Sequence, residues 1–272
     1  GRDIIACCGY HGWQDWYIGT TTRNIGVPQS VQDLTIPFEY SDLASLGRIF
    51  AEYPSQVAAV IMEPVGVVEP QDEFLHEVRR LTEREGSLLI FDEVLTGFRL
   101  AMGGAQEYFQ VKPDLACIGK AMGNGYAIAA VVGRREVMEL FDEVFFSFTF
   151  GGEVLSLAAA KATIAELRTK NVISHLWEQG SKLKDGYNLA VRKSGIERYT
   201  ECVGFPPRTM INFRTESGVD PLMVKSLFQQ ECLKRGVLVS ASQNLCYSHG
   251  DRDIEQTLNV YQTALDICAK AL

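Results

Sequence analysis

Three apolar segments of the chain lead, directly or within one residue, into an ionisable side chain. SLLIF is followed by Asp92, VAAVIM by Glu63, and LACIG by Lys120. Short apolar segments of this kind predict strands that are buried on both faces of a parallel sheet. Because ligands of such sheets bind outside the carboxyl ends of the strands, the three side chains predict a polar site at one edge of the sheet.

The pairing of Asp92 with Lys120 suits carbonyl–amine chemistry on pyridoxal phosphate. A lysine amine forms a Schiff base with the aldehyde of this cofactor, and a carboxylate keeps the ring nitrogen protonated so that the ring can accept electrons. Once the substrate amine has displaced it, the lysine can move a proton between the substrate carbon and the cofactor. These two residues therefore predict an internal aldimine on Lys120.

Two further segments offer parts of such a site. Tyr10 lies in the sequence YHGW after the first predicted strand, and its ring could cover one face of the cofactor. Thr149 precedes Phe150, two glycines and a long helical segment. A hydroxyl with small residues at a helix N-terminus is a reasonable seat for the phosphate.

Each of these residues also has a purely structural interpretation, and single spacings leave both open. Asp92 and Glu93 could cap a helix, as acids often do after a strand. Lys120 could be an ordinary surface lysine. Glu63, followed by Pro64, could mark only the end of a strand. Their joint occurrence at successive strand ends is what favours a site.

The same holds for the remaining candidates. Thr149 could cap the following helix at Glu153, and Tyr10 could pack in the core with the nearby tryptophans. The glycine-rich segment GKAMGNG lacks the ending and spacing of a phosphate-binding P-loop. The four histidines show no metal-ligand spacing, so no metal is assigned: His11, His76, His175 and His249.

Composition limits the possible classes of protein. The chain has 272 residues, 46% of them hydrophobic, which allows one large core or a large domain with a small one. Its 34 acidic and 26 basic residues give a net charge of -8, which argues against a nucleic-acid partner. The seven cysteines include no Cys-x-x-Cys pair, so we expect neither a disulfide framework nor a zinc site but a reducing, cytoplasmic setting.

Neither end of the chain suggests a membrane partner. No apolar run is long enough to span a bilayer, and no signal peptide opens the sequence. The chain begins with Gly1 rather than Met, at the approach to a predicted strand. We therefore expect an N-terminally truncated fragment.

The first half of the chain alternates strand-like and helix-like segments. This alternation predicts an α/β fold with a mainly parallel sheet. Strands are expected at Asp3–Cys8, Leu34–Phe38, Gln56–Met62, Ser87–Phe91, Leu115–Ile118 and Ala129–Gly133. Helical segments are expected at Asp42–Tyr53 behind a Ser41 or Asp42 cap, at Gln71–Glu85 ending on Gly86, and as a short turn at Gln106–Phe109.

The second half has a different pattern. Two long helices are expected at Glu153–Lys170 and Val172–Lys193, followed by strand Arg208–Phe213, helix Pro221–Arg235, strand Val237–Val239 and helix Asp251–Ala269. We therefore predict a large cofactor-binding domain over residues 1–170. Residues 171–272 are predicted to form a helical connection and a small α+β C-terminal domain.

Longer motifs carry a family resemblance. They are LLIFDEVLTGFRLAMGGAQEYFQVKPDLACIGKAMGNG, with YHGW and MEPVG before it, SFTFGGE after it, and LVSASQNLCYSHGDRDIEQTL near the end. On these motifs, which extend over essentially the whole chain, the protein resembles the class III aminotransferases of fold type I. It is most similar to their glutamate-1-semialdehyde 2,1-aminomutase-like branch. The resemblance implies the pyridoxal-phosphate-dependent transferase fold of type I.

The resemblance also implies roles for particular residues. Lys120 would be the Schiff-base lysine, Asp92 the partner of the ring nitrogen, and Val94 the apolar contact against the ring. Tyr10 would stack on the other face, and its neighbour His11 is taken as a further cofactor contact.

Other implied roles concern the substrate and a second subunit. Thr149 would bind the cofactor phosphate across the interface of a homodimer with shared active sites. Glu63 would lie on the substrate side, where we also place Trp13 of YHGW.

The sequence departs from the family pattern in three places. The Ser-Gly-Thr/Ser-Glu-Ala type turn, which contributes main-chain phosphate contacts in the family, is absent before Gly1. The segment QDWYIGTTTRNIGVP is shorter than the gating loop of aminomutases, which retains a released diamine intermediate. AMGNGYAIAAVVG and FTFGGE replace the usual patterns on the substrate side.

These departures favour a transaminase that moves an amino group between an amino donor and a carbonyl acceptor in two half-reactions. The nearest alternative is glutamate-1-semialdehyde 2,1-aminomutase activity, in which the amino group stays on the same skeleton. Outside this class, a nicotinamide-dependent oxidoreductase is disfavoured because no G-x-G-x-x-G follows an early strand. A catalytically silent fragment is the last alternative.

Overall fold

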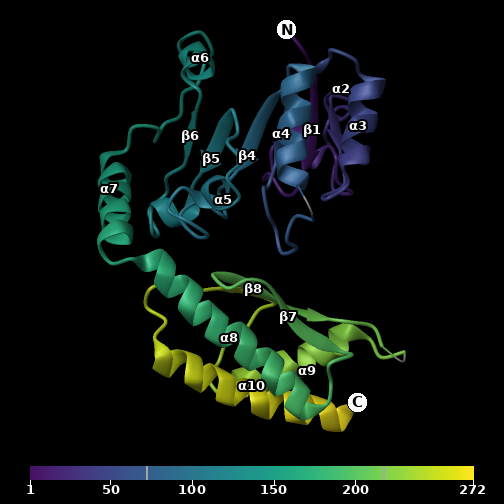
Figure 1. The fold of residues 1–272 in the computed structure, drawn as a ribbon, viewed down its shortest axis with the longest axis vertical. Coiled ribbons are helices and arrows are strands. Elements are labelled where there is room, and N and C mark those ends of the chain that lie inside the picture. Colours follow the sequence, from purple (N-terminus) through teal and green to yellow (C-terminus); the bar gives the residue numbers. More distant parts are fainter. Residues whose placement is uncertain (72, 217) are drawn as a thin grey trace. The chain divides into compact units, whose positions relative to one another are not determined.

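The structure is a computed structural model that describes residues 1–71, 73–216 and 218–272 (Figure 1). The chain divides into two compact units. The first unit contains Gly1–Gly66 and Pro70–Arg168, and the second contains Val67–Glu69 and Thr169–Leu272. In the described part of the chain, no helix has both the length and the apolar character needed to cross a bilayer.

A six-stranded sheet forms the centre of the first unit. Its strands lie in the order β2-β1-β3-β4-β5-β6, and only the pairing of β5 with β6 is antiparallel. The strands are β1 Ile4–Cys8, β2 Thr35–Pro37, β3 Val57–Met62, β4 Leu88–Asp92, β5 Leu115–Ile118 and β6 Ala130–Gly133. The predicted mainly parallel α/β sheet is therefore confirmed, with an antiparallel edge strand.

Helices connect these strands or follow the last of them. They are α1 Asp15–Ile18, α2 Gln29–Gln32, α3 Leu43–Glu52, α4 Phe74–Glu85, α5 Gly104–Tyr108, α6 Arg135–Met138 and α7 Val154–Thr169, with 3-10 turns η1 Lys120–Met122 and η2 Glu139–Asp142. Helices α3 and α4 contact each other and cover the same face of the sheet (Figure 1).

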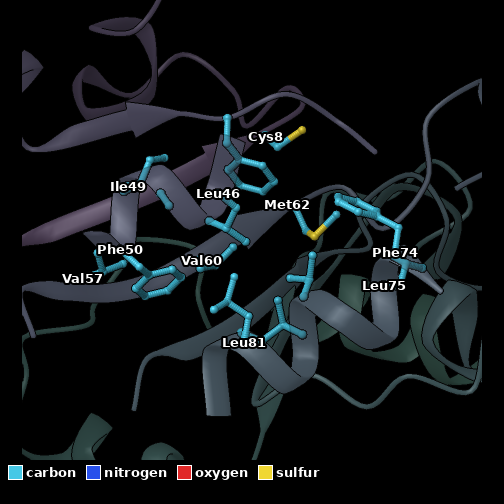
Figure 2. Close-up of a cluster of buried hydrophobic side chains, with 14 of the residues drawn as sticks. Cys8, Leu46, Ile49, Phe50, Val57, Val60, Met62, Phe74, Leu75 and Leu81 are labelled. Carbon is cyan, nitrogen blue, oxygen red and sulfur yellow. The ribbon is translucent and has the colours of Figure 1, made fainter. Parts of the chain in front are cut away.

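The core of this unit lies between those two helices and the strands. Figure 2 shows Leu46 and Ile49 of α3 and Leu81 of α4 among side chains of β3 such as Val60 and Met62. Leu46, Val60 and Met62 are fully buried. Burial of this apolar surface is the main favourable term that holds the sheet and helices together.

The ends of α3 and α4 follow from local sequence. Of the two predicted caps for α3, Asp42 is the one used, because its carboxylate accepts the Ser45 N–H at 3.1 Å. Helix α4 ends on Gly86, whose φ of 64° is left-handed. The helix begins at Phe74 rather than at the predicted Gln71. Asp72, which the predicted helix included, lies outside the described residues.

A buried carboxylate fixes the start of β5 against its neighbours. Asp114 accepts the Leu89 N–H of β4 at 2.7 Å, Arg79 of α4 at 2.8 Å and Arg134 after β6 at 2.8 Å. Burial alone raises the pKa of Asp114, but the hydrogen bonds from Leu89, Arg134 and Arg79 outweigh it and hold the pKa below its ordinary value. The β4–β5 pair is thus fastened at the end of the strands opposite to Asp92.

The second unit is a three-stranded antiparallel sheet, in the order β7-β8-β9, with three helices. Its elements are α8 Val172–Ser194, β7 Thr200–Phe205, β8 Arg208–Phe213, α9 Pro221–Lys234, β9 Ser242–Asn244 and α10 Asp251–Ala271. Tyr187 of α8, Phe228 of α9 and Tyr261 of α10 form a buried aromatic cluster with ring centroids 5.3–5.9 Å apart.

Sequence patterns failed at two strands of this unit. The predicted strand Val237–Val239 is wrong, because these residues lie in an irregular segment after α9 in which the Val237 N–H still bonds to Cys232 O. The third strand of this sheet is instead the more polar β9, which pairs with β8 on the side away from β7. Strand β7 was not predicted, since its buried side chains include Thr200 and Cys202 rather than a run of large apolar residues.

Candidate active site

Four neighbouring parallel strands deliver the candidate residues to one edge of the first sheet. In register, Cys8 at the end of β1 lies opposite Met62 of β3, Met62 lies opposite Phe91 of β4, and Asp92 lies opposite Cys117 of β5. The residues that follow these positions therefore leave the sheet at similar levels. They are Tyr10 and His11 after β1, Glu63 after β3, Asp92 at the end of β4, and Lys120 after β5.

Asp92 is a half-buried carboxylate with two hydrogen-bond partners in the protein. Its Oδ1 accepts the Val94 N–H at 3.1 Å, and its Oδ2 lies 2.9 Å from His11 Nδ1. The Asp92 side chain keeps 14% of its surface exposed. The carboxylate is therefore oriented by the protein and still open on one side.

His11 is buried and has a partner at each ring nitrogen. Its Nδ1 faces Asp92, and its Nε2 lies 3.0 Å from the carbonyl oxygen of Cys8. The ring stacks on Trp16, with centroids 5.8 Å apart and planes 22° apart, and meets Tyr17 edge to face. The sequence suggested His11 as a cofactor contact, and the structure shows how it is fixed beside Asp92.

Glu63 fastens the backbone of the loop that carries Tyr10. Its Oε2 accepts the Tyr10 N–H at 3.0 Å, and its own N–H bonds to Cys8 O. A side chain at Gly9 would come within 2.8 Å of Glu63 Oε2, and the φ of 103° there also favours glycine. The Tyr10 side chain itself is 64% exposed, so its ring is free to cover a ligand.

Lys120 is an exposed amine at a strained backbone position. It opens the η1 turn with φ of 42°, a left-handed value that non-glycine residues seldom adopt. No hydrogen bond or ion pair engages its amine within the described residues. Strain of this kind is found at functional sites, where the surrounding structure holds a residue in place.

Val94 lies next to the residue that precedes Lys120. A Cβ atom added at Gly119 would lie 3.5 Å from the Cγ1 atom of Val94. Val94 also lines a cavity of about 790 Å³ together with Ile118, Phe146 and Phe148. Asp92 and Lys120 are not in the lining of that mainly apolar cavity, which adjoins the strand-end residues through Val94 and Cys117.

A half-buried thiol lies opposite Asp92 in the sheet. Burial, and then the charge of Asp92, raise the pKa of Cys117 to about 11. The Cys117 thiol is therefore protonated at neutral pH and contributes no charge to the site.

The N-terminus of helix α7 is capped by an acidic side chain of the chain itself. The carboxylate of Glu153 accepts the N–H groups of Leu155 and Ser156, both at 2.7 Å, so an anion already occupies this helix N-terminus. Glu153 rather than Thr149 is the cap. Thr149 lies in an exposed loop, and no hydrogen bond joins it to the strand-end residues in the described part of the chain.

Trp13 lies at the surface beside the strand-end residues. Its side chain is 79% exposed, and the residues around it belong to the loop that follows β1. Trp13 lies two residues after His11 in the sequence, and among the described residues no hydrogen bond, ion pair or ring contact joins it to the other predicted site residues.

Glu93 has a structural role in the interior of the first unit. It is 1% exposed, and its Oε2 accepts Thr96 Oγ1 and the Ala105 N–H at 2.6 and 2.7 Å. Its Oε1 accepts the backbone and side-chain N–H groups of Gln106. A side chain at Gly104 would collide with this carboxylate. The sequence raised a helix cap at this acid pair, and Glu93 indeed caps α5, twelve residues away.

The ring end of pyridoxal phosphate fits the observed set of groups. Asp92 offers an oriented and partly open carboxylate for a protonated ring nitrogen, Tyr10 an exposed ring, and Lys120 an unpaired amine. These three come from β4, β1 and β5, which end at the same sheet edge. For the phosphate end, Thr149 is the only predicted residue.

Comparison with known proteins gives consistent results. The profile of the family Aminotransferase class-III matches residues 4–243. The chain is similar to glutamate-1-semialdehyde 2,1-aminomutase of Aquifex aeolicus (strain VF5), with 36% identity over 94% of this chain and 66% of that protein. It is also similar to 3-aminobutyryl-CoA aminotransferase of Cloacimonas acidaminovorans (strain Evry), with 33% identity over 100% of this chain and 67% of that protein.

Solved structures agree on the fold. The FumI protein of Sphingopyxis sp. MTA144, in its PLP internal aldimine form, superimposes with a TM-score of 0.90 and 26% identity over 98% of this chain and 65% of that chain. The present chain therefore spans about two thirds of the length of these proteins.

The capping role of Glu93 can be tested by stability. In Glu93→Gln, either orientation of the amide turns an NH₂ group toward two donors, so at least one buried backbone N–H loses its acceptor. We expect a loss of about 1–3 kcal/mol in the free energy of unfolding, measured by urea denaturation. Glu52→Gln, at an exposed position of α3, should change it by less than about 0.5 kcal/mol. Equal effects of the two changes would contradict the cap.

Proposed function

The chain belongs to the class III aminotransferase family, and on that premise we propose that it is a transaminase that uses pyridoxal phosphate to move an amino group from an amino donor to a carbonyl acceptor. The observation that carries the proposal is the arrival of Tyr10, Asp92 and Lys120 at one edge of four adjacent parallel strands. Enzymes of this family use pyridoxal phosphate.

Each residue would have a distinct task. When bound, pyridoxal phosphate supplies a ring that withdraws electrons from the substrate carbon bearing the amine. The Lys120 amine would hold the cofactor covalently and, when released, would move a proton at that substrate carbon. Asp92 would accept a hydrogen bond from the protonated ring nitrogen. Tyr10 would cover one face of the ring and Val94 would contact the other.

The remaining predicted contacts belong to the same proposal. His11 would act through Asp92, to which it is bonded. Glu63 and Trp13 would lie on the substrate side, although the Oε2 of Glu63 is already used to fix the Tyr10 loop. Thr149 would bind the phosphate. The proposed division is a cofactor-binding domain over residues 1–170 and a C-terminal part over 171–272, supported by the boundary between compact units near Arg168.

A cytoplasmic setting forms part of the proposal. All seven cysteines are free thiols, and five of them are buried. Burial raises the pKa of buried thiols such as Cys7, to about 11, and Cys202, to about 11, so they remain protonated. Unpaired thiols in this number are typical of proteins in reducing compartments.

Replacement of the proposed lysine tests the assignment directly. After incubation with pyridoxal phosphate and reduction with borohydride, mass spectrometry should find a pyridoxyl group on the Lys120 peptide. Lys120→Ala should lose this label and at least about 100-fold in turnover, because a positioned acid–base group contributes that much. Alanine has the same backbone preference against the left-handed φ, so the change alters the amine more than the fold.

Lys112→Ala is the matched control, since Lys112 is an exposed lysine near the opposite end of β5. It should keep both label and activity. A label that persists in Lys120→Ala refutes the lysine assignment, and a wild-type chain that takes no label supports the silent-fragment alternative.

Intramolecular transfer is the second candidate, favoured by the similarity to Aquifex aeolicus glutamate-1-semialdehyde 2,1-aminomutase. The similarity to an aminotransferase of Cloacimonas acidaminovorans, at 33% identity, and the short segment after YHGW favour transfer between two substrates. We expect amino transfer to require an added keto acid or aldehyde. Chromatography of glutamate-1-semialdehyde incubated with the protein alone provides the measurement, and rapid isomerisation there would establish the aminomutase.

A homodimer with shared sites is also proposed. The loop that carries Thr149 exposes Phe145, Phe148 and Phe150 by 97%, 64% and 79%. Contiguous exposed aromatic side chains of this kind usually mark a protein interface.

We expect analytical ultracentrifugation to show a dimer for the wild type and mainly monomer for the double variant Phe145→Ser, Phe150→Ser. Leu238→Ser, which removes an 87% exposed side chain from the second unit, should remain a dimer. A fully active monomeric wild type would contradict shared sites.

A further inference from the structure

The loop that follows β1 depends on a contact from another strand end for its shape. Residues 9–12 include two glycines, Gly9 and Gly12, with φ of 103° and 97°, so the backbone there has conformations available that other residues rarely adopt. Among the four backbone N–H groups of this segment, only that of Tyr10 has a hydrogen-bond acceptor in the described part of the chain. That acceptor is the carboxylate of Glu63.

Glu63 spans Gly9 with two hydrogen bonds. Its N–H donates to Cys8 O at 3.1 Å, and its Oε2 accepts the Tyr10 N–H at 3.0 Å. A Cβ atom added at Gly9 would lie 2.8 Å from Oε2 and 3.0 Å from Cγ of Glu63, so the Glu63 side chain runs directly against the Gly9 backbone. The first residue after β3 therefore holds the chain on both sides of Gly9.

The Tyr10 ring has few other contacts that could place it. The side chain is 64% exposed, and its one ring contact among the described residues is with Tyr17, edge to face with centroids 5.7 Å apart. A fixed N–H direction fixes the peptide plane before Tyr10, and so limits the directions in which its side chain leaves the backbone. The Glu63 contact therefore influences where the ring lies.

No ion pair holds the Glu63 carboxylate elsewhere. Within the described residues, no lysine, arginine or histidine forms a salt bridge with it. Burial, more than any charge, raises the pKa of the neighbouring Cys8 thiol to about 12 and also raises the pKa of Tyr17, so both are neutral near pH 7. The carboxylate is thus used for a backbone N–H, and hydrogen bonds to ionised acceptors are among the stronger ones in proteins.

We propose that Glu63 is a positioning residue for Tyr10, which fixes the loop so that the aromatic ring is in place before cofactor or substrate arrives. The consequence for cofactor binding rests on the proposed function, in which Tyr10 covers one face of pyridoxal phosphate. The location of Glu63 on the substrate side then follows from where β3 ends, and its carboxylate acts on the loop rather than on the substrate.

Amide hydrogen exchange tests the contact in the cofactor-free protein. After correction for intrinsic rates, nuclear magnetic resonance should show the Tyr10 N–H exchanging at least about tenfold more slowly than that of Gly12, which has no acceptor in the described part of the chain. This comparison uses the wild type and depends on no variant. A Tyr10 N–H that exchanges as fast as that of Gly12 would overturn the proposal.

Three variants separate the hydrogen bond from the charge. Glu63→Ala removes the acceptor and should raise the Tyr10 exchange rate at least about tenfold, whereas Glu63→Gln keeps a carbonyl oxygen there and should change it less than about threefold. Glu39→Ala is the matched control, because Glu39 is an exposed acid that also acts electrostatically on Cys8. No hydrogen bond joins its side chain to the loop in the described part of the chain, so it should leave the rate unchanged. Equal rates in Glu63→Ala and Glu39→Ala would refute the contact.

Cofactor affinity tests whether the contact acts through Tyr10. The apparent dissociation constant for pyridoxal phosphate, measured by absorbance titration, should rise about tenfold in Glu63→Ala and less than about threefold in Glu63→Gln. In a Tyr10→Ala background the same Glu63→Ala change should alter it by less than about twofold, because the ring that the loop presents is gone. An equal loss in both backgrounds would show that Glu63 does not act through Tyr10.

Two further outcomes keep this inference apart from the proposed function. If the wild type binds no pyridoxal phosphate, the proposed function fails together with the consequence for cofactor binding, and the amide exchange of Tyr10 alone decides whether Glu63 holds the loop. If Glu63→Gln raises the KM for the amino donor and leaves cofactor affinity unchanged, Glu63 contacts the substrate and the positioning role is refuted.

Discussion

The parallel register of β1, β3, β4 and β5 is the constraint on which the site depends. Main-chain hydrogen bonds fix where each strand ends, so groups far apart in sequence arrive at one sheet edge without direct contact among all of them. The buried Asp114 with its two arginines fixes the β4–β5 pair at the opposite end. A slip of one residue in this pair would turn Asp92 to the other face of the sheet.

The alternation of side chains between the two faces of a strand also explains why two neighbouring acids have different roles. Asp92 and Glu93 follow one another at the end of β4, and successive side chains point to opposite faces. Glu93 enters the interior and satisfies the N-terminus of α5, where four donors compensate its charge. Asp92 keeps an open side at the sheet edge and is oriented by His11 and Val94. The pair thus combines a structural carboxylate with one available for chemistry.

The loop after β1 is fastened from two sides. Glu63 holds its backbone at Tyr10, and Asp92 holds its side chain at His11. The aromatic ring of Tyr10 can remain exposed while its backbone is fixed, and this arrangement lowers the entropy lost when a flat ligand stacks on it. The proposed ring end of the site is supported by this geometry and by family membership, whereas the phosphate end and the second substrate are supported by fewer observations.

The sequence by itself determined the strands of the first sheet and the mainly parallel fold, because buried parallel strands are continuous apolar runs. It also located Asp92 and Lys120 at strand ends, where ligands of such sheets bind. Tertiary structure alone decided the partners of those residues. No spacing links Glu93 to Gln106 or His11 to Asp92, since these bonds depend on how loops fold back onto the sheet. The cap of α7 is likewise a local acid, Glu153, which accepts the free N–H groups of Leu155 and Ser156. Local patterns specify where strands and helices form, but polar partners are selected by distances that only the packed chain defines.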